Sequence, residues 1–321
     1  MNILFVSGGD QAFFNSLLVC LQSFSERVAG HRLLVCDFGF SPGQAQFLRG
    51  LGVLLERPAA CAADGVFVCK AALGRYLRQS GHRIEDYAAV VWLDADLTLM
   101  EVSERDFGAV IAAMQQDGAA VAACGEPAGG SLAQVAAERG MAPFARALAD
   151  ESLDGSAPYF SSGLIFCRSA TLLDDWEQAT RRVAAHPVYE QNMFNVAVHR
   201  NRLPFVTLEC EQWQAQGRSL DGVQLVAGAG ARPAARLGDK NINTLHATSP
   251  ELRHLLIAQC RLTVHGLDLC GPFKLLMAEP LRLHQLQLLS LFVAVHGEAL
   301  LRLGICTPAA KSAAGFDFTT L

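Results

Sequence analysis

The chain has 321 residues, of which 51% are hydrophobic and 18% charged, so it can bury a large core and is not expected to be disordered. Its formal net charge of -5 argues against a nucleic-acid-binding protein, because such proteins usually carry an excess of basic residues. The length fits one large α/β domain with additions or two small domains.

Strand and helix patterns alternate through the first hundred residues. Short apolar runs predict strands at residues 3–6, 32–36, 53–56 and 87–93. Helical patterns lie between them, at residues 13–24, 42–50 and 68–79. This order predicts the α/β class, with a mostly parallel, doubly wound sheet that has helices on its faces.

The rest of the chain is patterned less regularly. Further strands are expected at residues 121–124, 163–167, 205–208 and 243–246, and helices at residues 129–149, 172–185 and 190–198. The Gly- and Ala-rich stretch 216–236 predicts a loop, the region 250–303 is expected to be mainly helical, and the tail after Thr307 carries little pattern. We therefore expect one domain over residues 1–249 and a mainly helical C-terminal region over residues 250–321.

The cysteines and the N-terminus suggest a cytoplasmic protein. The ten cysteines form no CxxC pair and mostly lie in apolar runs, which indicates buried free thiols in a reducing compartment. The N-terminus is expected to be a first strand and not a signal peptide. The longest apolar stretch, residues 288–295, is far shorter than the roughly 20 residues of a membrane helix. Helix 281–303 could dock on a membrane surface as a peripheral contact, on a partner or on the core. Packing on the core is favoured, because the helix lacks the basic face expected at anionic lipid.

Two aspartates follow the most apolar predicted strand. Asp94-Ala95-Asp96 comes directly after VVWL, and ligands of open α/β sheets bind beyond the carboxyl ends of the strands. Carboxylates are hard oxygen ligands that suit Mg²⁺ or Mn²⁺. An ion held there can bridge a diphosphate and stabilise charge on a leaving nucleotide. The sequence therefore predicts a divalent-metal site at this strand end.

Six separated segments of the chain are, in order, FVSGGDQAFF, KAALGRYL, VVWLDADLTL, YFSSGLIF, YEQNMFN and NTLHATS. Together and in this order they resemble the GT-A glycosyltransferases, and within them family 8, the glycogenin and bacterial lipopolysaccharide galactosyltransferase group. They lie between residues 3 and 249, and the C-terminal region is not covered. The resemblance implies a Rossmann-like GT-A fold with a helical C-terminal extension. It also implies metal-dependent transfer of a hexose from a UDP-sugar donor to a glycan, lipid or protein that the sequence does not identify.

The resemblance also implies roles for individual residues. Asp94, Asp96 and His246 would hold Mn²⁺ or Mg²⁺. Donor contacts are implied for Ser7, Gly8, Gly9, Asp10, Lys70, Asp94, Ala95, Ser161 and Ser162. The residue types agree in part, because glycine lets backbone approach a nucleotide closely, and Lys70 is expected at a helix start, where a cation and the helix N-terminus both favour phosphate.

Glu190 and Gln191 are the catalytic residues that the resemblance implies. The corresponding pair in the family lies beside the reacting carbon of the sugar, where Glu190 could hold sugar hydroxyls. Gln191 is an amide and cannot serve as the general base that an inverting enzyme needs. We therefore expect transfer with retention of the anomeric configuration.

Departures from the family leave two other functions open. Ser161 replaces the usual Asn, Glu190 the usual Asp, and Leu252 the usual phosphate-binding Lys, which leaves a non-catalytic nucleotide-sugar-binding protein as one alternative. The other is a haloacid-dehalogenase-like phosphatase, with Asp94 attacking phosphate and Asp96 as acid/base. Gly238-Asp239 weakly resembles its later acidic motif. Against the phosphatase, three βα units precede Asp94, and Asn243 stands where an Asp is wanted.

Overall fold

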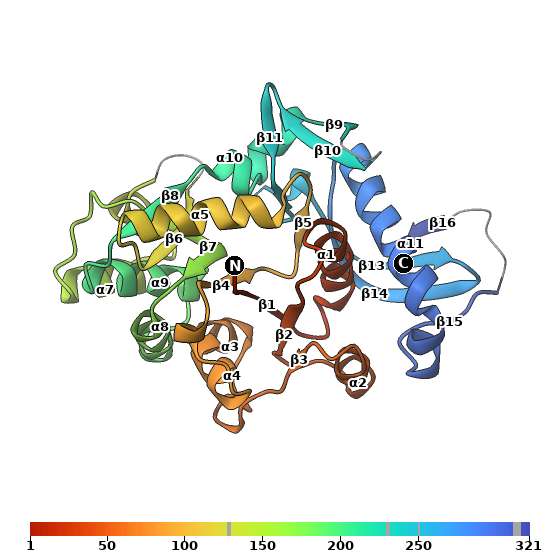
Figure 1. The fold of residues 1–321 in the computed structure, drawn as a ribbon, viewed down its shortest axis with the longest axis horizontal. Coiled ribbons are helices and arrows are strands. Elements are labelled where there is room, and N and C mark those ends of the chain that lie inside the picture. Colours follow the sequence, from red (N-terminus) through yellow and green to blue (C-terminus); the bar gives the residue numbers. More distant parts are fainter. Residues whose placement is uncertain (127–129, 229–231, 250, 311–315) are drawn as a thin grey trace. The chain divides into compact units, whose positions relative to one another are not determined.

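The computed structural model describes residues 1–126, 130–228, 232–249, 251–310 and 316–321 (Figure 1). Contacts divide the chain into two discontinuous units. Unit 1 comprises Met1–Val6, Leu55–Leu93 and Arg105–Cys210, and unit 2 comprises Ser7–Leu54, Asp94–Glu104 and Glu211–Leu321. No border of these units falls at residue 249, where the sequence suggested a domain boundary.

A seven-stranded, mostly parallel sheet is the main sheet of the fold, with strand order β3-β2-β1-β4-β7-β6-β8. Its strands are β1 (Ile3–Gly9), β2 (Leu33–Asp37), β3 (Leu54–Leu55), β4 (Ala89–Leu93), β6 (Val121–Gly125), β7 (Phe160–Cys167) and β8 (Phe205–Leu208). β1 pairs parallel with β4 and β6 pairs parallel with β8, whereas β7 runs antiparallel to both β4 and β6. The predicted α/β class and mostly parallel sheet are confirmed.

The helices of unit 1 follow the expected pattern with three differences. They are α3 (Val66–Ala71), α4 (Leu73–Gln79), α5 (Glu104–Gln116), α6 (Leu132–Ala136), α7 (Ala142–Asp150), α8 (Ala170–Arg182) and α9 (Tyr189–Arg200). The helix expected over residues 68–79 starts earlier and is interrupted at Ala72, and α5 was not predicted. The helical segment expected over residues 129–149 forms two short helices, and residue 129 lies outside the described residues. Short 3₁₀ turns, Ala59–Cys61 and Ile84–Asp86, complete this unit.

Unit 2 contains three more small sheets besides its helices. Its helices are α1 (Phe14–Arg27), α2 (Pro42–Gly50), α10 (Cys210–Trp213) and α11 (Glu279–Arg302), with 3₁₀ turns at Gly217–Gly222 and Leu252–His254. The small sheets contain β5 (Leu97–Leu99), β9 (Val223–Ala227), β10 (Pro233–Leu237), β11 (Lys240–Ile242), β12 (Thr244–His246), β13 (Leu255–Val264), β14 (Leu267–Leu276), β15 (Thr307–Pro308) and β16 (Phe316–Thr320). Strand order is β11-β10-β9 in one, β12-β5 in the second and β15-β14-β13-β16 in the third.

The expectation of a mainly helical region from residue 250 is wrong before α11. β13 and β14 pair antiparallel over their whole length, and Val264 pairs with Leu267 across a two-residue turn. The turn residues, His265 and Gly266, have φ of 50° and 74°, which is the geometry that two-residue hairpins favour. β13 buries alternate residues towards its end, so the period is that of a strand. The hairpin precedes the helix expected over 281–303, which is present as α11 and packs against α1 and β14.

The loop expected over residues 216–236 is also wrong in its described part. β9 and β10 pair antiparallel there, with Ala235 opposite Leu225. Residues 229–231 of that stretch lie outside the described residues, as do residues 311–315 of the tail. The tail contributes β16, which pairs with β13. β9 and β16 are edge strands, and β10 is the middle strand of a three-stranded sheet. These short strands show little apolar alternation, and β16 pairs with a strand far from it in the chain, so no local pattern marked them.

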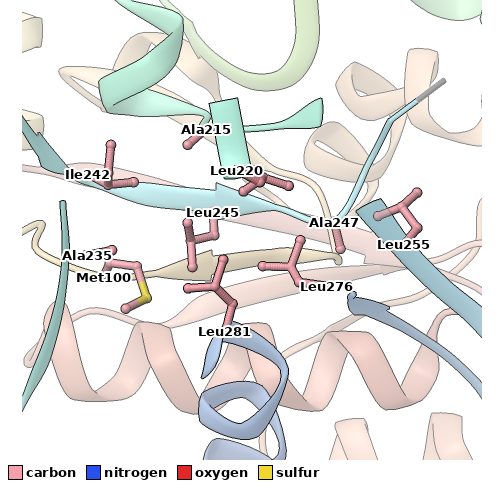
Figure 2. Packing of buried hydrophobic residues seen from close by; sticks show 10 residues of the cluster. All are labelled: Met100, Ala215, Leu220, Ala235, Ile242, Leu245, Ala247, Leu255, Leu276 and Leu281. Carbon is pink, nitrogen blue, oxygen red and sulfur yellow. The ribbon is translucent and has the colours of Figure 1, made fainter. Parts of the chain in front are cut away.

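A hydrophobic cluster lies around β5 and β12, and Figure 2 shows its side chains pointing toward one another. Its members come from strands β10 to β14, from the segment before β9, from positions next to β5 and β12, and from the start of α11. They are Met100, Ala215, Leu220, Ala235, Ile242, Leu245, Ala247, Leu255, Leu276 and Leu281. Gln285 of α11 ties these elements together, because its side chain donates to the Thr98 hydroxyl at 3.0 Å and accepts from the Leu276 N–H at 2.8 Å. The C-terminal hairpin and helix therefore share a core with β5, the strand next to Asp96.

The described cysteines form no disulfide, and all but Cys270 are buried, as expected from their apolar surroundings. Among the described residues, no helix combines the length and apolar character that crossing a membrane requires.

Two glycines test the hairpin turn. An added Cβ would have open space at both Gly266, in the turn, and Gly108, in α5, so only backbone conformation distinguishes them. Gly266→Ala should lower the free energy of unfolding by about 1 kcal/mol, because φ is positive there. Gly108→Ala should raise it by about 0.5–1 kcal/mol, because alanine favours helix. Urea denaturation measures both, and two shifts of the same sign would contradict the turn geometry.

Candidate functional site

Three metal-ligating side chains meet in unit 2. Asp94 follows β4 and Asp96 precedes β5, and the pairing of β5 with β12 sets His246 opposite Leu97, next to Asp96. His246 Nε2 lies 3.0 Å from Asp96 Oδ1 and 3.7 Å from Asp94 Oδ2. The ligand atoms of the three residues lie within 4.8 Å of one another. Strand pairing therefore brings together residues that lie about 150 positions apart in the sequence.

The donor set fits a divalent cation of the Mg²⁺ or Mn²⁺ type. Two carboxylates offer hard oxygen atoms and the imidazole offers one nitrogen, and Mn²⁺ accepts this mixture. Asp96 and His246 are buried, whereas the Asp94 side chain is 23% exposed, so the cluster is rigid but reachable from solvent.

The Gln214 amide contacts the far side of the His246 ring, with Nε2 at 2.6 Å from Nδ1. A histidine that binds a metal through Nε2 carries its proton on Nδ1, so its neighbour must accept that proton. An amide rotated by half a turn presents its oxygen to Nδ1 in place of its nitrogen. Gln214 can therefore orient His246 in either tautomer. No motif around Gln214 points to this role.

Lys274 is a second residue that the motifs missed. Its ammonium, on β14, contacts Asp96 Oδ2, while Oδ1 of the same carboxylate faces His246. Burial alone would raise the pKa of the Asp96 carboxyl, but Lys274 and His246 together hold that pKa well below its usual range. Asp96 is therefore charged at neutral pH. A lone lysine inside the apolar run GPFKLL was the available sequence signal, because a charge in such a run needs a partner.

The loop after β1 contains the first group of predicted donor contacts. Ser7 is buried, and its hydroxyl has no hydrogen-bond partner among the described residues. A Cβ at Gly8 would lie 2.5 Å from the Phe38 ring, so aromatic packing already explains that glycine. Asp10 Oδ1 accepts from the N–H groups of Ala12 and Phe13 at 2.9 and 3.1 Å and fixes the turn into α1. Gly9 lies at the end of β1, and Ala95 is buried between the two aspartates.

A separate polar cluster lies within unit 1. Ser162 on β7 accepts from Lys70 Nζ at 3.0 Å and donates to the Glu190 carboxylate at 3.1 Å. Lys70 and Glu190 also form a buried ion pair at 3.2 Å, with side chains only 9% and 5% exposed. Lys70 lies in the last turn of α3, so the expectation that it stands at a helix N-terminus is wrong. The helix begins after Gly65, two residues earlier than the pattern suggested.

Gln191 is held in the same cluster by both ends of its amide. Its Oε1 accepts from the Ser162 N–H at 3.0 Å, and its Nε2 donates to the Tyr159 hydroxyl at 2.9 Å. Burial raises the pKa of Tyr159, so the hydroxyl keeps its proton and donates to Asn192 Oδ1 at 2.7 Å. Ser161 is buried beside them and accepts from the Gly163 N–H at 3.3 Å. The structure therefore brings Lys70, Ser162, Glu190 and Gln191 together in one hydrogen-bonded cluster.

Val188, the residue before α9, is strained. Its φ of 44° and ψ of 36° are left-handed, a conformation that a β-branched residue rarely adopts. Trp176 Nε1 donates to the Glu190 carbonyl at 2.7 Å and fixes the first turn of α9 just beyond the strained residue. Backbone strain is characteristic of functional positions, where surrounding contacts hold it in place.

Comparison with solved structures concerns the fold. WbbM, a bifunctional glycosyltransferase, matches with a TM-score of 0.51 at 10% identity over 78% of this chain, which spans only 46% of WbbM. The galactosyltransferase LgtC, solved with donor and acceptor sugar analogues, matches at 14% identity and a TM-score of 0.46, covering 78% of this chain and 88% of LgtC. Mouse xyloside xylosyltransferase 1 matches at 12% identity and a TM-score of 0.43, covering 77% of this chain and 97% of the mouse protein. No family model and no curated protein matches the sequence.

The likeness to WbbM confirms the GT-A-like fold that the motifs suggested, and at these identities it concerns the fold alone. Substrate and chemistry must therefore be argued from the residues of this chain.

The buried pair Lys70–Glu190 gives a stability prediction. Glu190→Gln leaves the Lys70 ammonium buried without its counter-charge and should cost about 3 kcal/mol or more of unfolding free energy. The double variant Lys70→Met/Glu190→Gln should recover most of that loss, since no charge is then left buried. Glu85→Gln breaks the exposed pair with Arg83 and serves as the control, with almost no change expected. Additive losses in the double variant, measured by urea denaturation, would show that the two charges do not depend on each other.

Proposed function

We propose that the chain is a metal-dependent glycosyltransferase that moves a hexose from a UDP-sugar donor to an unidentified glycan, lipid or protein acceptor. The observation that carries the proposal is the meeting of Asp94, Asp96 and His246 at the end of β4, within a GT-A-like fold. Asp94, Asp96 and His246 would hold Mn²⁺ or Mg²⁺. When bound, such an ion supplies positive charge for a diphosphate leaving group.

The residues of this chain position the donor in the proposed reaction. Gly9 and Asp10, at the end of β1, would contact the nucleotide, together with Ser7, Gly8 and Ala95. Lys70, Ser161 and Ser162 belong to the second cluster, and we assign them to the sugar-phosphate part of the donor. Because Lys70 is neutralised by Glu190, it would act through the hydrogen bond to Ser162 more than as a free cation.

Glu190 and Gln191 are the proposed catalytic residues. Gln191 is neutral and rigidly held, so it can face a sugar carbon that gains positive charge but cannot take a proton. Glu190 is engaged by an ammonium and a hydroxyl, both of which stabilise its charged form and weaken it as a base. Without a protein base, the acceptor proton passes to the departing phosphate on the same face of the sugar, which gives retention.

The phosphatase alternative needs Asp96 as an acid that gives up a proton. Its carboxyl is buried between His246 and Lys274, and its pKa lies well below the usual range, so it holds no proton to give at neutral pH. Asp239, the other acidic residue considered, is exposed in the turn between β10 and β11. Both observations favour the transferase over the phosphatase.

The donor prediction is tested by calorimetry with UDP, GDP and CDP in the presence of Mn²⁺. UDP should bind most tightly, EDTA should abolish binding, and Asp96→Asn should weaken Mn²⁺ binding at least tenfold because one ligand charge is lost. Asp239→Asn makes the same change at an exposed site and should bind as the wild type does. Tighter binding of GDP, or unchanged Mn²⁺ affinity in Asp96→Asn, would refute the assignment. Donor hydrolysis by the wild type separates an enzyme from a non-catalytic binding protein.

Retention is tested on the product of an α-linked UDP-hexose. Proton NMR should give the small anomeric coupling of an α-linked product, and Gln191→Ala should slow transfer by at least tenfold while Mn²⁺ binding stays unchanged. A β-linked product would show that a base operates, and Glu190 would then replace Gln191 as the central catalytic residue.

A further inference from the structure

Lys274 lies beside the proposed metal site on a strand that the family resemblance does not reach. The chain uses lysine sparingly, at positions 70, 240, 274 and 311, and relies on arginine elsewhere. Lys274 contacts the outer oxygen of Asp96, Oδ2, and its side chain is 19% exposed. An ammonium on a metal-binding carboxylate competes with the metal, so its presence there calls for a compensating interaction.

The position of Lys274 is fixed by the start of α1. Ser16 donates its hydroxyl to the carbonyl of Lys274 at 3.1 Å, and Asn15 donates its amide to the carbonyl of Pro272 at 3.0 Å. The ammonium also stands 5.2 Å from the centre of the Phe13 ring, within cation–π range. Backbone, ring and carboxylate thus hold the ammonium in one place, so little freedom is lost when it binds a further ligand.

The chemistry of an ammonium limits what that ligand can be. Lysine has three N–H donors and no acceptor, and it binds phosphate oxygens as a compact point charge. One N–H of the Lys274 ammonium contacts Asp96, and the exposed part of the Lys274 side chain leaves room for an anion to bind the ammonium. Leu252 replaces the lysine that the family resemblance would place on the phosphates, although the side chain of Leu252 lies outside the described residues.

We propose that Lys274, supplied by the C-terminal hairpin, binds the diphosphate of the donor beside the metal held by Asp94, Asp96 and His246. This inference rests on the proposed function. It makes metal and diphosphate interdependent, because Lys274 opposes the ion when no anion is present and is neutralised when the diphosphate arrives. Each ligand therefore strengthens the binding of the other through the same charge.

The test measures Mn²⁺ binding alone, by the electron paramagnetic resonance signal of free Mn²⁺, and UDP binding at saturating Mn²⁺, by calorimetry. Lys274→Met should bind Mn²⁺ alone a few-fold more tightly than the wild type, yet bind UDP at least tenfold more weakly. Lys274→Arg should restore most of the UDP affinity. Lys240→Met removes the same charge from an exposed lysine of unit 2 and should match the wild type in both measurements.

The outcomes separate the two levels of the proposal. Unchanged UDP affinity in Lys274→Met overturns the role of Lys274 and leaves the proposed function standing. Weaker Mn²⁺ binding in that variant would show that Lys274 supports the metal ligands, and it also overturns the inference. A wild type that binds no UDP with Mn²⁺ overturns both. If Lys274→Met does not fold, Lys274→Gln removes the charge, keeps a donor for Asp96 and takes the same measurements.

Discussion

A carboxylate taken out of water must be matched by groups that stabilise its charge, and Asp96 obtains them from two distant segments. His246 comes from β12 and Lys274 from β14. The Ala247 N–H donates to the Asp96 backbone carbonyl at 3.1 Å and holds the end of β12 beside this residue. The β5–β12 pairing and the hydrophobic cluster around it position His246, and the hydrogen bonds between α1 and β14 position Lys274. Unit 2 is in this sense organised around one buried charge.

Unit 1 also buries a carboxylate, that of Glu190, but with a different second partner. Glu190 contacts Lys70 and Ser162, so a serine takes the place that a histidine has beside Asp96, and the Trp92 ring lies 5.7 Å from the Lys70 ammonium. Each cluster pairs a buried carboxylate with a lysine ammonium. In both, a charge taken out of water is tolerated because an opposite charge and further hydrogen bonds accompany it.

The residues that carry local signals could be predicted from the sequence. β4 is an unbroken apolar run with two adjacent valines, so its place inside a sheet and the aspartates at its end were predictable. The hairpin β13–β14 was missed, although His265-Gly266 is a turn signal, because its flanking residues include enough leucine to suggest a helix. Lys274 and Gln214 could not be assigned, since their roles arise from contacts across about 178 and 32 residues that no local pattern encodes.

The bonds from Asn15 and Ser16 to β14 join residues 257 and 258 positions apart, which has a consequence for biosynthesis. Contacts of such separation form late, because nearly the whole intervening chain must first leave the ribosome. β1 to β4 can associate on the nascent chain while Asp96 still lacks both His246 and Lys274. The charged cluster around Asp96 would then be complete only near the end of translation, once β12 and β14 have been made.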